Sequence, residues 1–178
     1  MSKIASRIIL IPEKVIVNLQ PEKIFVEGPL GRSEELTILP EIKIIKNINQ
    51  ITTSSENISL AGTYNSLIHN MIKGVVEGYQ ETLEVKGIGY KVIMKDQQLE
   101  FSLGKSHLIH VPIPAELQVK VEGGKITIKG LNKQQVNMFA ANKIRPLRPP
   151  SIYKKSKGIY YLGEEETMKL KAGKSLNK

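Results

Sequence analysis

Two stretches of this chain match each other closely enough to suggest that one folding unit is used twice. Residues 11–31 (IPEKVIVNLQPEKIFVEGPLG) align without gaps on residues 113–133 (IPAELQVKVEGGKITIKGLNK), at a constant offset of 102. The identical pairs include Ile11 with Ile113, Pro12 with Pro114, Val17 with Val119, Lys23 with Lys125, Ile24 with Ile126 and Gly28 with Gly130. Alternating apolar and polar residues make unrelated hairpins look alike, but the shared proline and closing glycine favour a duplication. The sequence therefore predicts two tandem domains, 1–82 and 83–178.

Each copy is expected to combine strands with one helix. Between residues 14 and 28 apolar side chains occupy every second position, so we expect Val15, Val17 and Leu19 to point inward from a strand. From 60 to 79 the apolar spacing changes to three or four residues, which predicts an amphipathic helix. The predicted fold class is α+β, with two duplicated domains that each pack a small, mostly antiparallel sheet against a helix.

The ends of the helices also leave signals in the sequence. Ser55 or Asn57 is a candidate cap for the first helix. The second helix is predicted from about Lys133 to Ile144. Its inward stripe consists of Val136, Phe139, Ala140 and Ile144. Pro146 cannot continue that helix, and it biases the preceding Arg145 away from helical geometry.

Positive charge is concentrated near the C-terminus. Residues 1–141 hold 16 Lys and Arg against 14 Asp and Glu, whereas residues 142–178 hold 10 against 3. Such a concentration indicates a polyanionic partner, and the alternative is a solvated tail. There is no cysteine, which excludes disulfides and thiolate metal sites. Apolar runs are far shorter than the roughly 20 residues of a membrane span, so we expect a soluble protein with no membrane contact.

The residue patterns that carry catalysis or metal binding are missing from the sequence. Lys86–Lys91 (KGIGYK) lacks the third glycine of a dinucleotide fingerprint and leads into a predicted strand. His107 and His110 are three residues apart, so in an extended segment they face opposite sides. His69 is expected on the solvent side of the first helix. We therefore predict no catalytic residue, no metal and no cofactor, and a protein that is not an enzyme.

The segment LRPPSIYKKSKGIYY, residues 147–161, combines residue types that bind RNA. With its flanks it supplies fixed positive charge from Arg145, Arg148, Lys154, Lys155 and Lys157. Its rings, Tyr153, Tyr160 and Tyr161, are expected to stack on bases or sugars. Pro146, Pro149 and Pro150 are expected to hold the backbone extended, while Gly158 lets the main chain approach phosphates. We predict a stiff basic arm that binds a folded RNA. The alternative is an adaptor module whose arm docks on an acidic protein.

The chain as a whole resembles a known family, that of the sixth protein of the large ribosomal subunit, of bacterial and organellar type. The matching motifs are MSKIASRIILIP at the start, VEGPLG at 26–31, VKGIGYK at 85–91, FSLGKSH at 101–107, NKQQVNMFAANKIRPLRPP at 132–150 and KLKAGK at 169–174. Most of these motifs are weak alone, but in this order, over nearly the whole length, they are highly specific.

The resemblance implies a role as well as two related α+β domains. Members bind large-subunit rRNA near the sarcin-ricin loop, beside the site of translational GTPases, among neighbouring ribosomal proteins. The family's Tyr-Lys-Gly-Lys-Gly core falls on Tyr153 to Gly158, here YKKSKG and one residue longer. The resemblance carries RNA binding over to Tyr153, Lys154, Lys157 and Gly158, and Lys155, Lys169, Lys171 and Lys174 complete the predicted site. It implies ribosomes in the cytoplasm, with the plastid stroma as the other compartment.

Overall fold

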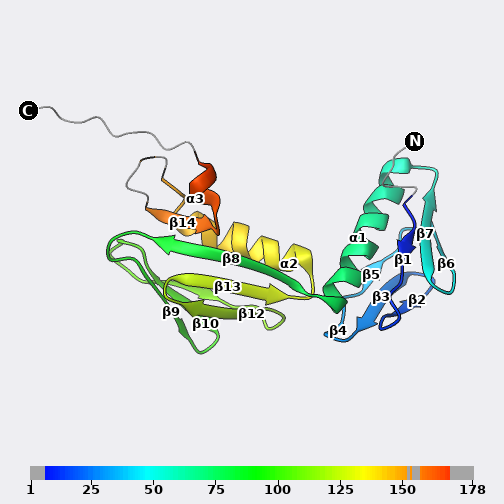
Figure 1. The fold of residues 1–178 in the computed structure, drawn as a ribbon, viewed down its shortest axis with the longest axis horizontal. Helices are drawn as coiled ribbons and strands as arrows, with labels where there is room; N and C mark the ends of the chain where they lie inside the picture. Colours follow the sequence, from blue (N-terminus) through cyan, green and yellow to red (C-terminus); the bar gives the residue numbers. More distant parts are fainter. Residues whose placement is uncertain (1–6, 152, 154–156, 169–178) are drawn as a thin grey trace, which may run out of the picture. The chain divides into compact units, whose positions relative to one another are not determined.

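A computed structural model describes residues 7–151, 153 and 157–168, which form two compact units (Figure 1). The described part of the first unit comprises residues 7–79 and 131–133, and that of the second comprises 80–130, 134–151, 153 and 157–168. The sheets and helices agree with the predicted α+β class. The domain boundaries predicted from the sequence, 1–82 and 83–178, stay a prediction.

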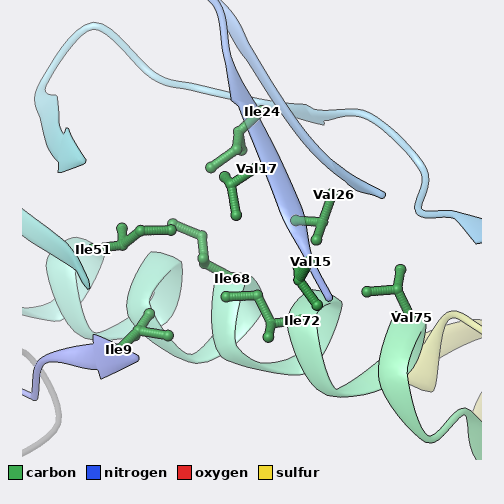
Figure 2. Close-up of a cluster of buried hydrophobic side chains, with 9 residues drawn as sticks. All are labelled: Ile9, Val15, Val17, Ile24, Val26, Ile51, Ile68, Ile72 and Val75. Atoms are coloured by element: carbon green, nitrogen blue, oxygen red, sulfur yellow. The ribbon is translucent and has the colours of Figure 1, made fainter. Parts of the chain in front are cut away.

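The first unit packs two small antiparallel sheets against one helix. One sheet has the order β1 (Ile9–Leu10), β7 (Gln50–Ser55), β6 (Ile42–Lys46). In the other, β3 (Lys23–Gly28) pairs with β2 (Ile16–Leu19), β4 (Gly31–Arg32) and β5 (Leu36–Thr37). The helix is α1 (Ile58–Val76). Figure 2 shows the core of this unit, in which side chains from the strands and from α1 point toward one another. The core side chains are Ile9, Val15, Val17, Ile24, Val26, Ile51, Ile68, Ile72 and Val75.

Local signals define where α1 starts and stops. Of the two predicted candidates, Asn57 is the cap, because its Oδ1 accepts from Ser59 N at 3.0 Å. The helix ends before Gly78, whose φ of +74° is the left-handed conformation typical of a helix terminus. The predicted extension to Tyr79 is therefore wrong, and Tyr79 begins the next strand. Leu19, predicted to point inward, is 38% exposed because it ends β2 beside the hairpin turn.

The second unit repeats the plan with added elements. One sheet has the order β11 (Ile109–Pro112), β10 (Gln98–Ser102), β9 (Lys91–Lys95). The other has the order β12 (Gln118–Glu122), β13 (Lys125–Gly130), β8 (Tyr79–Lys86), β14 (Gly158–Tyr161). The helices are α2 (Lys133–Met138) and the short α3 (Glu164–Thr167).

The helical segment that starts with α2 changes its winding along its length. It continues as a π-helix over Phe139–Ile144 and as a 3₁₀ turn over Arg145–Leu147. The predicted inward stripe is confirmed, since its four residues are buried. The prediction for Arg145 is wrong: its φ and ψ of −57° and −39° are helical, because Pro146 stands at the start of a new turn, where its missing N–H costs nothing.

The duplication is visible in the structure, but its register differs from the predicted one. Element order equates β1, β2, β3, β6, β7 and α1 with β8, β9, β10, β12, β13 and α2. Buried residues then pair 75 positions apart: Val17 with Val92, Ile24 with Leu99, Ile51 with Ile126, Ala61 with Val136 and Tyr64 with Phe139. The offset of 102 is wrong, since it matched the β2–β3 hairpin with β12–β13. Strand alternation gave the two hairpins the same pattern although they occupy different places in the fold.

Main-chain hydrogen bonds repeat in the 75-residue register. Ile38 N donates to Glu22 O at 2.7 Å, and Ile113 N donates to Gln97 O at 2.9 Å. After Phe139 the offset becomes 76, so that buried Ile144 takes the place of Ile68. The π-helix accommodates this one extra residue, because its wider turn keeps the apolar face directed at the sheet.

Candidate nucleic-acid interface

Strand pairing gathers several connections at one end of the second unit. Lys86 at the end of β8 lies opposite Gly158 at the start of β14, and Ser102 at the end of β10 lies opposite Lys91. The loops that leave these strands, residues 87–90 and 103–108, therefore lie together at the tip of β8 (Figure 1). The turn between β12 and β13 joins them, because Val85 N donates to Gly124 O at 2.9 Å.

Tyr90 lies at the centre of this loop cluster. A Cβ on Gly87 would come within 2.6 Å of its ring and one on Gly104 within 3.2 Å. Both glycines have positive φ, +148° and +69°, so the backbone as well as the space requires glycine. The guanidinium carbon of Arg148 lies 6.0 Å from the Tyr90 ring centroid. Residues far apart in sequence thus form one surface of a ring and a cation.

Four exposed cations lie in or next to this loop cluster. Lys91, Lys105, Arg148 and Lys157 all have exposed side chains. Within the described part of the chain, none of the four makes an ion pair shorter than 4.0 Å. We name these four side chains together with Tyr90 the cationic end. Sequence reasoning missed Tyr90, Lys91 and Lys105, although the glycines flanking Tyr90 were a usable signal.

Two further cations of this unit are neutralised internally. Arg145 bonds to Glu164, and its guanidinium carbon lies 5.0 Å from the Tyr161 ring centroid. Lys86 bonds to Glu165 and lies 3.2 Å from Glu84. The hydrogen bond to Glu165 is the main cause that raises the pKa of Lys86. Glu164 and Glu165 of the acidic run are therefore part of an ion-pair network.

Glu84 forms ion pairs with two lysines, Lys86 and Lys125. Lys125 also reaches it, at 3.2 Å. Burial acts to raise the pKa of Glu84, but hydrogen bonds from Lys86 and Lys125 outweigh it, so the pKa is lowered. The charged form of this carboxylate is thus the stable one beside the cationic end.

The two described ends of the predicted arm are hydrogen-bonded to each other. Ile159 N donates to Arg148 O at 2.9 Å, and Ser151 N donates to Lys157 O at 3.1 Å. These bonds join Arg148 and Ser151 to the chain at Lys157–Ile159. Pro146 lies in the 3₁₀ turn, so the expectation that all three prolines hold an extended backbone is wrong for that one.

The three tyrosines of the arm occupy different environments. Tyr153 is 54% exposed, as stacking on a base requires. Tyr160 is fully buried, so the prediction that it stacks on RNA is wrong. Its hydroxyl accepts from Ser151 N at 3.1 Å and donates to Ser151 O at 3.2 Å, which ties β14 to the arm. Tyr161 is half-buried beneath Arg145.

Gly158 is required by protein packing. Its φ is +143°, and a Cβ there would lie 2.6 Å from Pro149 O and 2.9 Å from Pro150 Cα. The residue is buried against these prolines. Five of the predicted site residues, Lys154, Lys155, Lys169, Lys171 and Lys174, lie outside the described residues.

The described residues offer no obvious alternative chemistry. None of their His, Cys, Asp and Glu side chains group in threes as a metal site would need. His69, expected in solvent, is half-buried on α1, and burial together with Arg7, Lys73 and Lys133 lowers its pKa. No described helix is long and apolar enough to cross a bilayer.

Comparison with known proteins gives full-length relatives. The family model described as Ribosomal protein L6 matches residues 86–161. The large ribosomal subunit protein uL6 of Persephonella marina is 44% identical over 184 residues, and the match covers all of both chains. The uL6 of Hydrogenobaculum sp. is 43% identical, covering 100% of this chain and 98% of its own. The uL6 of Helicobacter pylori strain G27 is 38% identical, with both chains fully covered.

Proposed function

Because this chain belongs to the ribosomal protein L6 family, we propose that it is a structural constituent of the large ribosomal subunit that binds large-subunit rRNA. The end-to-end match to relatives that carry this name is the observation that supports it most strongly. In this proposal the chain holds RNA in place and performs no reaction. Its site of action is the ribosome in the cytoplasm, among neighbouring ribosomal proteins.

The cationic end is the proposed contact with RNA. Its four exposed cations are free to approach phosphates, and Tyr90 and the arm's Tyr153 offer rings to bases or sugars. A loop cluster of this kind suits an irregular RNA, whose splayed bases and curved backbone expose both groups together. The rRNA near the sarcin-ricin loop, beside the translational GTPase site, is the target that the family resemblance suggests.

The first unit lacks the same features at equivalent positions. In the 75-residue register Tyr90 corresponds to Val15, which is buried in the core. Gly87 and Gly89 correspond to Pro12 and Lys14. This contrast favours the second unit as the RNA-binding one.

The binding proposal is tested with the full chain and a large-subunit rRNA fragment that contains the sarcin-ricin loop. Arg148→Gln with Lys157→Gln should weaken binding and flatten the slope of log K against log salt by about 1.4 to 1.8, at about 0.7 to 0.9 for each lost phosphate contact. Lys14→Gln with Lys43→Gln, exposed lysines of the first unit, is the matched control and should leave the slope unchanged. Equal effects of the two pairs would contradict the proposal.

Assembly is tested separately. A structural constituent should stay with large subunits through a high-salt wash and sedimentation. An adaptor for an acidic protein should instead remain in the soluble fraction, and recovery of the chain there would reject the ribosomal role.

A further inference from the structure

The short helix α3 is tied to both sides of the cationic end. Glu164 accepts a hydrogen bond from Arg145, in the turn that leads to Arg148. Its neighbour Glu165 accepts one from Lys86, the residue before the 87–90 loop. Two consecutive carboxylates therefore hold the two segments from which Arg148 and Tyr90 project.

Glu164 also closes its own turn. Its second carboxylate oxygen accepts from Tyr161 N at 2.8 Å, at the end of β14. The Arg145 guanidinium bonds to this carboxylate, and its carbon lies 5.0 Å from the Tyr161 ring centroid. The side chains of Arg145 and Glu164 are 35% and 20% exposed, so solvent screens the pair only in part. A charge-assisted contact in this setting restricts both segments.

We infer that Glu164 is a positioning residue for RNA binding, and that Arg145 acts through it and makes no phosphate contact of its own. This inference rests on the proposed function, and it changes the role that was predicted for Arg145. The guanidinium is already paired with Glu164 and lies near the Tyr161 ring, so less of its charge is available to a phosphate. The carboxylate in turn holds the arm in the conformation that presents Arg148.

The inference predicts that Glu164→Gln changes the affinity for RNA in an unusual direction. Removing a negative charge from an RNA-binding protein ordinarily tightens binding, because repulsion of phosphates falls. If Glu164 positions the arm, Glu164→Gln weakens binding by about three- to tenfold, in the lower part of the range for coupled contacts. The glutamine still offers an oxygen to Tyr161 N, so the variant tests the charge.

A double-mutant cycle distinguishes the two roles of Arg145. We expect Arg145→Gln and Glu164→Gln to weaken binding to the rRNA fragment equally, and the double variant to be no worse than either. The salt slope should stay at the wild-type value in all three. Glu166→Gln is the matched control: it is exposed, removes the same charge and should not weaken binding. Tighter binding by Glu164→Gln, or a slope flattened by about 0.9 in Arg145→Gln, overturns the inference.

A measurement without RNA keeps this test separate from the proposed function. Amide hydrogen exchange at Ile159 and Tyr161 should accelerate several-fold in Arg145→Gln and Glu164→Gln but not in Glu166→Gln. Unchanged exchange would overturn the positioning role even if the wild-type chain binds rRNA. Accelerated exchange in these two variants, together with a wild-type chain that does not bind the rRNA fragment, would instead reject the proposed function alone.

Discussion

At the scale of single residues, surroundings decide the role of side chains that look alike in the sequence. Tyr153 and Tyr160 share one segment, yet the first is exposed and the second is fully buried and bonded to Ser151. Arg145 and Arg148 are three residues apart, yet one is paired with Glu164 and the other lies near Tyr90. Residue type therefore identified the candidate side chains, and only their contacts in the structure showed which role each one can have.

Alanine substitutions at two glycines distinguish the cost of a steric clash from the cost of backbone strain. Gly158→Ala should lower the free energy of unfolding by about 1–3 kcal/mol, because its Cβ would meet Pro149 O at 2.6 Å and its φ of +143° suits only glycine. Gly163→Ala, where φ is +79° and no atom lies within 4 Å, should cost only about 1 kcal/mol. Urea unfolding of both variants checks the difference. A loss at Gly163 as large as that at Gly158 would show that Pro149 does not matter.

His69 predicts a pH dependence of stability. Burial, then Arg7, Lys73 and Lys133, lowers its pKa in the folded chain below the usual 6.5. The unfolded chain therefore binds the proton more readily, so the free energy of unfolding should fall as pH drops through 6.5 toward the folded-state pKa. His69→Gln should show a shallower fall between about pH 7.5 and 5.5 in urea titrations. Parallel curves for the two proteins would contradict this.

At the scale of elements, the same helix is built in two ways. α1 runs as an unbroken α-helix, while its counterpart passes from α to π to 3₁₀ winding. The extra residue in the π segment keeps Ile144 in the core, and the 3₁₀ turn then delivers the chain to Arg148. Helical periodicity predicted the buried stripe, but it does not distinguish an α-helix from a helix with one wide turn.

The start of α1 provides a test of capping. Asn57→Ala should lower the free energy of unfolding by about 1 kcal/mol, because Ser59 N loses its acceptor. Asn57→Asp keeps the acceptor and adds a negative charge at the positive end of the helix, so it should match or exceed the wild type. Thermal unfolding of both variants measures this. A destabilised Asn57→Asp would show that Asn57 acts through something other than its oxygen.

At the scale of the whole molecule, duplication produced two cores and one cationic end. Ile51 and Ile126 occupy equivalent places in β7 and β13, and both are fully buried. The equivalent of Tyr90 in the first unit is the core residue Val15. The two units therefore share what packing requires and differ where the second unit is proposed to meet RNA.

Equivalent cavity-forming substitutions in the two cores test whether the units have separate roles. Ile51→Ala and Ile126→Ala should each cost about 2–5 kcal/mol, as expected for truncation of a buried isoleucine. Hydrogen exchange should locate each loss in its own unit, and only Ile126→Ala should also weaken binding to the rRNA fragment near its unfolding temperature. Equal loss of binding in the two variants would mean that the units do not act separately.

Local sequence patterns were sufficient to predict the fold class and several details of the helices. Alternation and helical spacing predicted the α+β class, the buried stripe of the second helix and the cap at Asn57, because neighbouring residues set these features. The counts of charge located the excess in the last 37 residues, and the ordered motifs identified the family.

Only the tertiary structure decided which strands pair, which cations are free and which rings are exposed. Alternation indicates which face of a strand is apolar but not which strand it pairs with, so the predicted repeat was 102 residues where the fold has 75. Net charge counts Arg145 and Lys86 equally with Arg148, although Glu164 and Glu165 neutralise the first two. Tyr90, Lys105 and Arg148 come together because strand pairing brings distant loops to one end, and contacts of that kind leave no local pattern in a single sequence.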